Sequence, residues 1–226
     1  PAVEVLVNGR LAPLYFISAT QINAQAPWET ESGAAQVVVR RGGVSSRPAT
    51  LMVQASVPSL FALNGAGFGP AIAVRAANGG FVGPANPPAA GDVLTLYASG
   101  LGPVEPAVAS GAEGPSSPLS RVMRPQRAMV NGYPARVLFA GLAPTFVGVF
   151  QINLQLPEQV AAGDVLQYFS GPRMANLLTI GATEFSRLEF LPLPEGAANV
   201  LGIVDSEMNG GFVAVKALQS PDRDAV

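Results

Sequence analysis

The feature that most constrains the fold of this 226-residue chain is an internal repeat. The motif Gln-Ile-Asn-x-Gln-x-Pro occurs at residues 21–27 and again at 151–157, each time after a Val-Asn-Gly motif, at 7–9 and 130–132. A segment that returns in the same order predicts two copies of one structural unit. From the glycine to the glutamine there are 12 positions in the first copy and 19 in the second. We expect this insertion of seven residues, around 141–148, to lie in a loop.

In both copies the repeated strand alternates between apolar and polar side chains. A period of two indicates a β-strand with one packed face and one face toward water or a ligand. We therefore expect the apolar faces to place one strand in each of two cores. Proline cannot donate to a β-ladder, so Pro27 and Pro157 should end these strands. The apolar sets are Ile22, Ala24, Ala26 and Ile152, Leu154, Leu156, and the polar columns are Gln21, Asn23, Gln25 and Gln151, Asn153, Gln155.

Short apolar runs bounded by glycine or proline predict further strands at the spacing typical of a β-sandwich. They cover residues 36–40, 49–53, 71–76, 93–98, 165–169 and 177–181. Asn-Gly pairs favour type I′ hairpin turns, and we expect hairpin tips above all at Asn78 and Asn209. No window of a dozen residues carries a helical stripe, so the sequence predicts an all-β protein.

The length suggests two compact units of about 100 residues each. We predict two tandem immunoglobulin-like β-sandwich domains, a short one over residues 1–56 and a larger one over 57–184. A β-rich C-terminal extension follows over residues 185–226, with apolar stretches that predict a hairpin and with a frayed end. Within the second domain, residues 102–125 are rich in Pro, Gly, Ser and Ala, which predicts a long surface loop or an excursion between sheets.

The composition excludes several classes of function. The chain has neither histidine nor cysteine, which removes Ser-His-Asp and Cys-His catalysis and ordinary zinc sites. Asp92 and Asp164 each stand in an Ala-Gly-Asp-Val segment and are interpreted as turn formers. We predict no catalytic residue, no metal site and no cofactor. A net charge of −2 with scattered arginines is no footprint for nucleic acid, and no apolar run approaches the ~18 residues that span a bilayer.

The candidate contact residues are Trp28 and the two polar columns. Trp28 is the only tryptophan, and we interpret it as packing beside Pro27 at a domain junction, with stacking on carbohydrate or anchoring a partner as the alternative. The columns are interpreted as solvated sheet faces, with a binding face as the alternative. For a carbohydrate-binding module the candidate stacking rings are Trp28, Tyr97, Tyr133 and Tyr168.

Several motifs beside the repeat resemble a known family. They are Pro27-Trp28-Glu29-Thr30, Gly42-Gly43-Val44-Ser45-Ser46, the segment from Gly91 to Pro103, and Leu138-Phe139-Ala140-Gly141-Leu142-Ala143-Pro144. The sequence from about Val5 to Thr183 resembles the uncharacterised C-terminal domain family that is abundant in Solibacter and other Acidobacteria. The resemblance implies tandem immunoglobulin-like modules at the C-terminal ends of large exported proteins, without an assigned activity. Two departures are the segment 167–176, which lacks a second Gly-Gly-Val-Ser-Ser-like turn, and about forty further residues at the C-terminal end.

The sequence therefore favours a non-catalytic structural or protein-interaction module. We expect it to be secreted or at the cell surface of a bacterium, within a larger exported protein or assembly, and to have a protein partner. A carbohydrate- or polymer-binding module is the alternative. A glycoside hydrolase that uses carboxylates alone is less favoured, since it needs two acids about 5 to 10 Å apart and the sequence offers no suggestive pair.

Overall fold

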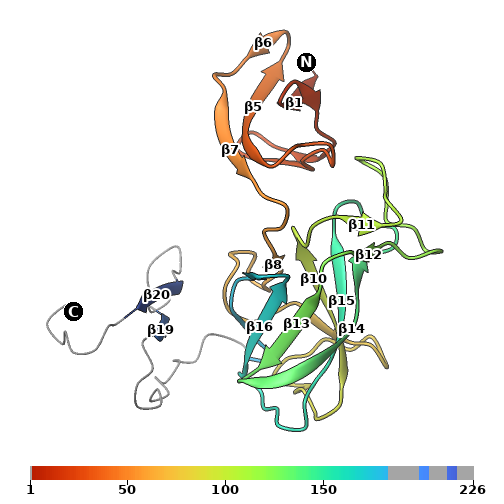
Figure 1. The fold of residues 1–226 in the computed structure, drawn as a ribbon, viewed down its shortest axis with the longest axis vertical. Coiled ribbons are helices and arrows are strands. Elements are labelled where there is room, and N and C mark those ends of the chain that lie inside the picture. Colours follow the sequence, from red (N-terminus) through yellow and green to blue (C-terminus); the bar gives the residue numbers. More distant parts are fainter. Residues whose placement is uncertain (1, 183–198, 204–212, 218–226) are drawn as a thin grey trace, which may run out of the picture.

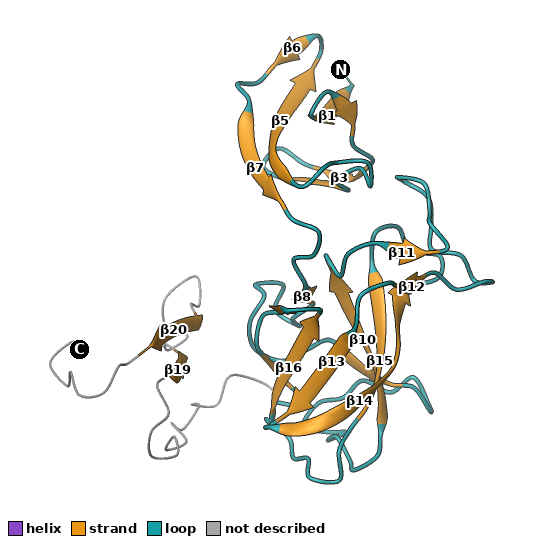
Figure 2. Ribbon diagram, in the orientation of Figure 1, coloured by secondary structure: helices purple, strands orange, loops and turns teal. Residues whose placement is uncertain are grey.

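The computed structural model describes residues 2–182, 199–203 and 213–217. Every regular element in these residues is a β-strand, so the predicted all-β class is confirmed (Figure 2). Two units follow one another along the chain and are joined by a linker, residues 54–58 (Figure 1). We call residues 2–53 the N-terminal unit and residues 59–182 the C-terminal unit.

The N-terminal unit is a small, incompletely covered sheet. Its strands are β1 (Val3–Val7), β2 (Arg10–Leu11), β3 (Leu14–Ile17), β4 (Ile22–Ala24), β5 (Gly33–Arg41), β6 (Val44–Ser45) and β7 (Ala49–Val53). The sheet has the order β2-β1-β5-β6, and β7 pairs with the same central strand β5. The hairpin β3-β4 stands apart from it as a separate two-stranded sheet. A small cluster between them is buried, formed by Val5, Val7, Ala12 and Ala35.

The C-terminal unit has a larger sheet. Its strands are β8 (Ser59–Leu60), β9 (Ala73–Arg75), β10 (Val93–Ser99), β11 (Val104–Glu105), β12 (Arg121–Val122), β13 (Gln126–Val130), β14 (Tyr133–Leu142), β15 (Phe150–Gln155), β16 (Val165–Ser170), β17 (Arg173–Met174) and β18 (Leu178–Thr179). The main path runs β17-β16-β13-β14-β15-β10-β8. Strand β14 serves both halves, since it pairs with β13 over Tyr133–Ala135 and with β15 from Arg136 onward, with a register shift between Val137 and Phe139.

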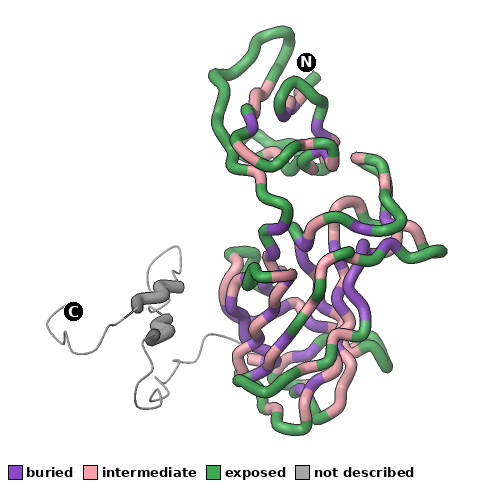
Figure 3. Tube along the Cα trace, in the orientation of Figure 1, coloured by how far each residue is buried: buried purple, intermediate pink, exposed green. Residues whose placement is uncertain are grey.

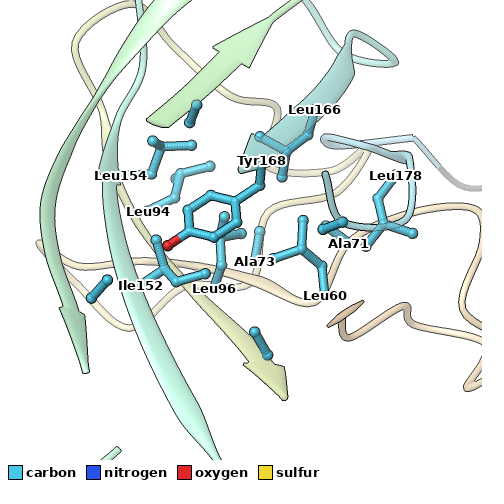
Figure 4. Close-up of a cluster of buried hydrophobic side chains, with 14 of the residues drawn as sticks. Leu60, Ala71, Ala73, Leu94, Leu96, Ile152, Leu154, Leu166, Tyr168 and Leu178 are labelled. Atoms are coloured by element: carbon cyan, nitrogen blue, oxygen red, sulfur yellow. The ribbon is translucent and has the colours of Figure 1, made fainter. Parts of the chain in front are cut away.

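The ladder of the C-terminal unit closes on itself. Strand β10 pairs with β15 on one side and with β9 on the other. The segment that leads into β9 forms a parallel bridge from Pro70 to Thr179 of β18, and β18 pairs with β16. The inward faces enclose one core in which Leu94, Leu154 and Leu166 surround the ring of Tyr168 (Figure 4). Figure 3 shows that buried positions are concentrated in this unit, whereas most of the N-terminal unit is exposed.

The sequence repeat is also a repeat of strands. In order, β1, β4, β5, β6 and β7 of the N-terminal unit correspond to β13, β15, β16, β17 and β18 of the C-terminal unit, and β2 with β3 corresponds to the long β14. In both units the Val-Asn-Gly motif makes the first hairpin, with positive φ at Asn8 (50°) and Gly9 (79°) and at Asn131 (47°) and Gly132 (84°). Val7 pairs with Val37 just as Val130 pairs with Leu166.

The six strands predicted outside the repeat overlap β5, β7, β9, β10, β16 and β18. The turn predicted at Asn78 follows β9, and across it Val74 of β9 forms an isolated antiparallel bridge with Phe81. The turn predicted at Asn209 lies outside the described residues. In the first copy the backbone ladder is interrupted at Ala12 and Pro13, between β2 and β3, because proline has no N–H to donate. Most of the insertion expected around 141–148 lies in the loop 143–149 between β14 and β15, whereas Gly141 and Leu142 belong to β14.

In the C-terminal extension, β19 (Asn199–Ile203) and β20 (Val213–Ala217) form an antiparallel pair. They lie in two of the apolar stretches from which the sequence predicts a hairpin. The third apolar stretch, residues 188–193, and the polar end from residue 220 lie outside the described residues.

Candidate functional site

The two units can be compared position by position at the edge formed by β7 and β18. Val37 pairs with Ala49, and its counterpart Leu166 pairs with Leu178. Leu51 follows Val37 by 14 positions, and Ile180 follows Leu166 by the same 14 positions. Leu51 and Ile180 are therefore equivalent residues in the two copies. Leu51 pairs with the buried Ala35, so its side chain belongs to the inner face of the sheet.

These equivalent residues differ sharply in exposure. Ile180 is 0% exposed in the C-terminal unit, whereas Leu51 is 47% exposed in the N-terminal unit. The repeated strand shows the same contrast, because Leu154 and Leu156 are buried but their counterparts Ala24 and Ala26 are exposed. Our expectation that Ala24 and Ala26 pack in a core of the first copy is wrong.

The difference in exposure has a physical reason. In the C-terminal unit a further strand, β10, pairs with β15, whereas the described residues contain no such strand beside β4. In the C-terminal unit, β10 lies along the outer edge of β15 from Val93 opposite Gln155 to Ala98 opposite Phe150. The ladder extends beyond the strand ends, as the N–H of Leu156 donates to the carbonyl oxygen of Asp92 (2.8 Å). In the described part of the chain, β4 pairs only with β3. The apolar face of the N-terminal unit is therefore open on that side.

The open side holds a groove with a volume of about 570 Å³. One wall is the end of β4 and the residues after it, and the other is β7 with the linker. The tips of β10 and β15 in the C-terminal unit close its end with Ser99, Gly100 and Phe150. The principal wall residues are Ala24, Ala26, Trp28, Leu51, Met52 and Val53. We call this feature the β4–β7 groove.

Trp28 lies at the contact between the two units, at the end of the groove. Its ring and that of Phe150 form a T-shaped contact with the centroids 6.4 Å apart and the planes at 79°. Its backbone N–H donates to Ser110 Oγ (2.8 Å), and that hydroxyl donates to Glu29 Oε2 (3.0 Å). The pKa of Glu29 is lowered, first by a hydrogen bond from its own backbone N–H and then by the bond from Ser110. The segment 102–125, which contains β11 and β12, thus reaches the N-terminal unit.

The linker is fixed to the C-terminal unit beside the groove. Ser56 Oγ donates to the carbonyl oxygens of Gly100 (3.1 Å) and Leu101 (3.3 Å). The N–H of Val57 donates to the same carbonyl of Gly100 (2.9 Å). These bonds and the Trp28 contact hold the groove at a defined junction rather than on a free tether.

The polar columns make the same local bond in both copies. Gln21 Nε2 donates to Asn23 Oδ1 (2.7 Å), and Gln151 Nε2 donates to Asn153 Oδ1 (2.9 Å). These pairs satisfy each other along the outer face of the strand, as neighbouring polar groups on a solvated sheet do. Gln155 is half-buried and lies in register with Val93 and Arg136.

Gln25 is the member of the columns that contacts the other unit. Its Oε1 accepts from the N–H of Gly111 (2.7 Å) and from the hydroxyl of Tyr15 (3.2 Å). Gln25 and Trp28 are thus brought together at the junction, and the other candidate residues are not. Sequence reasoning missed Leu51 and Met52 as site residues. The signal that pointed to them is the alanine at 24 and 26, where the second copy has leucine.

The candidate stacking rings do not form one platform. Tyr168 is 0% exposed and lies in the core (Figure 4). Its hydroxyl donates to Gln126 Oε1. Tyr97 lies against Phe146 with the ring centroids 6.4 Å apart. Tyr133 is exposed and begins β14 at the hairpin after β13. Trp28 is at the junction, so the four rings lie in different parts of the molecule.

The two aspartates of the Ala-Gly-Asp-Val segments both serve in turns. Asp92 Oδ2 accepts from the N–H of Ala89 (2.9 Å), and Asp164 Oδ2 accepts from the N–H of Ala161 (2.7 Å). Asp92 also accepts from Arg75 Nη2 (2.7 Å), and this hydrogen bond is the first cause that lowers the pKa of Asp92. Among the described residues, no three acidic side chains gather into a group that could hold a metal ion.

Comparison of the chain with protein-family models, with curated proteins and with solved structures gives no match. Within the described residues, no helix has the length and apolar character needed to cross a membrane. The groove and the junction are therefore the features from which a function can be argued.

Proposed function

We propose that this chain is a non-catalytic structural and protein-interaction module of a larger exported protein or assembly, acting outside the cell or at its surface. We further propose that both units are immunoglobulin-like modules, and among the described residues the first has no strand paired with the free edge of β4. The motif resemblance to exported C-terminal modules and the shared strand order of the two units support this proposal.

The observation that carries the proposal is the β4–β7 groove. A monomeric soluble protein seldom leaves a contiguous apolar face open, and such faces commonly mark interaction sites. Here the same chain contains a second copy of the unit in which the equivalent face is covered, with Ile180 at 0% exposure against 47% for Leu51. The comparison supports a surface that becomes buried in an assembly.

The polar side chains support a non-catalytic role. The chain has no histidine or cysteine to act as a base or nucleophile near neutral pH. Asp92, Asp164 and Glu29 hold turns and the junction through the hydrogen bonds described above. The dispersed positions of Trp28, Tyr97, Tyr133 and Tyr168 give no specific support to carbohydrate binding.

Photo-crosslinking in the native cells tests the proposal. A benzophenone amino acid replaces Leu51 in the groove or, as a matched control, Tyr133 in the C-terminal unit, since both side chains are 47% exposed. We expect a discrete protein adduct from position 51 in the exported fraction and none from position 133. A chain found only inside the cell, without an adduct at position 51, would overturn the proposal.

A further inference from the structure

We propose that the β4–β7 groove binds an extended strand of a partner polypeptide, added antiparallel to β4. This inference rests on the proposed function and names the partner's chemistry. The strands β4 and β15 are equivalent in the two units, and β15 is completed by such an antiparallel strand, β10. The incoming strand would take the place in the N-terminal unit that β10 holds in the C-terminal unit.

The backbone of β4 offers the required hydrogen-bonding groups. The N–H of Gln25 donates to the carbonyl oxygen of Pro13 on the β3 side (2.9 Å). Backbone groups alternate between the two sides of a strand, so those of Ala24 and Ala26 face away from β3. The equivalent group of the second copy, the N–H of Leu156, faces β10 and donates to Asp92. An extended peptide is the class of ligand that matches such an edge.

The side chains of the groove also indicate which side chains the partner strand has on its inner face. In the C-terminal unit, Leu94 lies opposite Leu154 and Leu96 lies opposite Ile152. The N-terminal unit keeps the isoleucine as Ile22 but has Ala24 in place of the leucine. The space left by this smaller residue favours a larger side chain at the Leu94 position of the incoming strand. The partner strand is thus expected to alternate, with a phenylalanine-sized residue opposite Ala24 and a leucine-sized residue opposite Ile22.

The groove also has room on its second wall. In the C-terminal unit the space between β15 and β18 is filled by β10 together with the segment that leads into β9. In the N-terminal unit the corresponding space between β4 and β7 is the groove itself, lined by Leu51 and Val53. An apolar residue on the inner face of the partner strand would cover Leu51, as Ile180 is covered in the second copy.

The test uses the full chain and a fluorescent peptide with the sequence of residues 90–101, measured by fluorescence anisotropy. We expect saturable binding, tighter for the peptide in which the residue at the Leu94 position is phenylalanine. A peptide with aspartate at the Leu94 and Leu96 positions should not bind. Leu51→Asp in the chain should weaken binding about tenfold or more, because a buried leucine contact is replaced by a charge, whereas Met123→Asp should leave it unchanged.

Hydrogen exchange gives a second, independent readout. Bound peptide should slow exchange of the Ala24 and Ala26 amides and leave the amide of Gln25, already bonded to Pro13, little changed. Ala24→Pro removes one edge donor at a position where proline is tolerated, and it should weaken the peptide without unfolding the chain.

Absence of peptide binding, or binding that Leu51→Asp and Ala24→Pro leave intact, would overturn the inference. Concentration-dependent dimerisation that protects Ala24 without peptide would also overturn it, because the occupant would then be a second copy. The result is separable from that of the crosslinking experiment. An adduct at position 51 without strand binding leaves the interaction module standing, and strand binding without an adduct defeats only the cellular role.

Discussion

The hydroxyl of Tyr168 is a polar atom at the centre of an apolar core, and its surroundings explain how it can be there. It donates to Gln126 Oε1, and Gln126 Nε2 donates to the carbonyl oxygen of Arg124 (2.8 Å) and to Ser170 Oγ (3.0 Å). Ser170 Oγ in turn donates to the carbonyl oxygen of Leu101 (2.8 Å). A buried polar group is tolerated when it has such partners, and removing one partner leaves another unsatisfied.

We therefore expect Tyr168→Phe to lower the free energy of unfolding by about 1–3 kcal/mol, since Gln126 Oε1 would lose its donor in the core. Urea denaturation followed by circular dichroism measures the change. Tyr133→Phe is the matched control, because Tyr133 is exposed and its variant should unfold like the parent chain. Equal losses in the two variants would contradict the prediction.

Ionisation of Tyr168 should make the free energy of unfolding depend on pH in the alkaline range. Burial raises the pKa of Tyr168 well above its ordinary value. Below a pH of about 10 the tyrosine is protonated in both states, and above it the unfolded state ionises first, so stability falls as the pH rises. In Tyr168→Phe this part of the fall should be missing. Unfolding free energies measured from pH 8 to pH 11 check the difference in slope between the two chains.

At the scale of elements, the close packing of β14 against β12 requires a glycine, Gly141, at the point where the two strands meet. Gly141 lies in register with Arg121, and a Cβ at Gly141 would meet the carbonyl oxygen of Ser120 at 2.1 Å and Phe139 Cζ at 2.6 Å. Gly141→Ala should therefore lower the free energy of unfolding by about 1–3 kcal/mol. Gly83→Ala is the control, since a Cβ there meets nothing within 4 Å, and thermal unfolding of both variants measures the contrast.

The strands themselves were largely predictable, because the information that defines them is local. Alternation and bounding turns predict β7 over residues 49–53, and the structure has it over the same residues. Which strand covers which is not local information. The identity of β10 as the cover of β15 depends on residues more than fifty positions apart in the chain. The groove was missed for that reason, since alternation in the first copy looks the same whether or not a cover is present.

At the scale of the whole molecule, the two units are held together by few contacts, of which Trp28 is the largest side chain. Trp28→Ala removes the ring that meets Phe150, and it should lower the stability of the N-terminal unit by about 2 kcal/mol. We expect thermal unfolding of the variant to show two separate transitions, one for each unit. Small-angle scattering should show a broader range of molecular dimensions than for the parent chain.

Trp28→Phe retains an aromatic ring at this position and should keep most of the coupling. Identical scattering curves for the parent chain and the alanine variant would show that the linker bonds of Ser56 and Val57 suffice. The sequence indicated a junction near Trp28 because a lone tryptophan follows a proline that was predicted to end a strand. It carried no signal that Ser110 and Gly111, far along the chain, complete that junction.

The bridge that closes the ladder of the C-terminal unit affects the order in which the two units fold during synthesis. The bridge between Pro70 and Thr179 joins residues more than a hundred positions apart, whereas every strand pair of the N-terminal unit forms within residues 3–53. Contacts between distant residues form late in folding, because the intervening chain must first be ordered. On the ribosome, the N-terminal unit can therefore fold before most of the C-terminal unit has been synthesised. The unpaired edge of β4 is accessible to a partner strand throughout that interval.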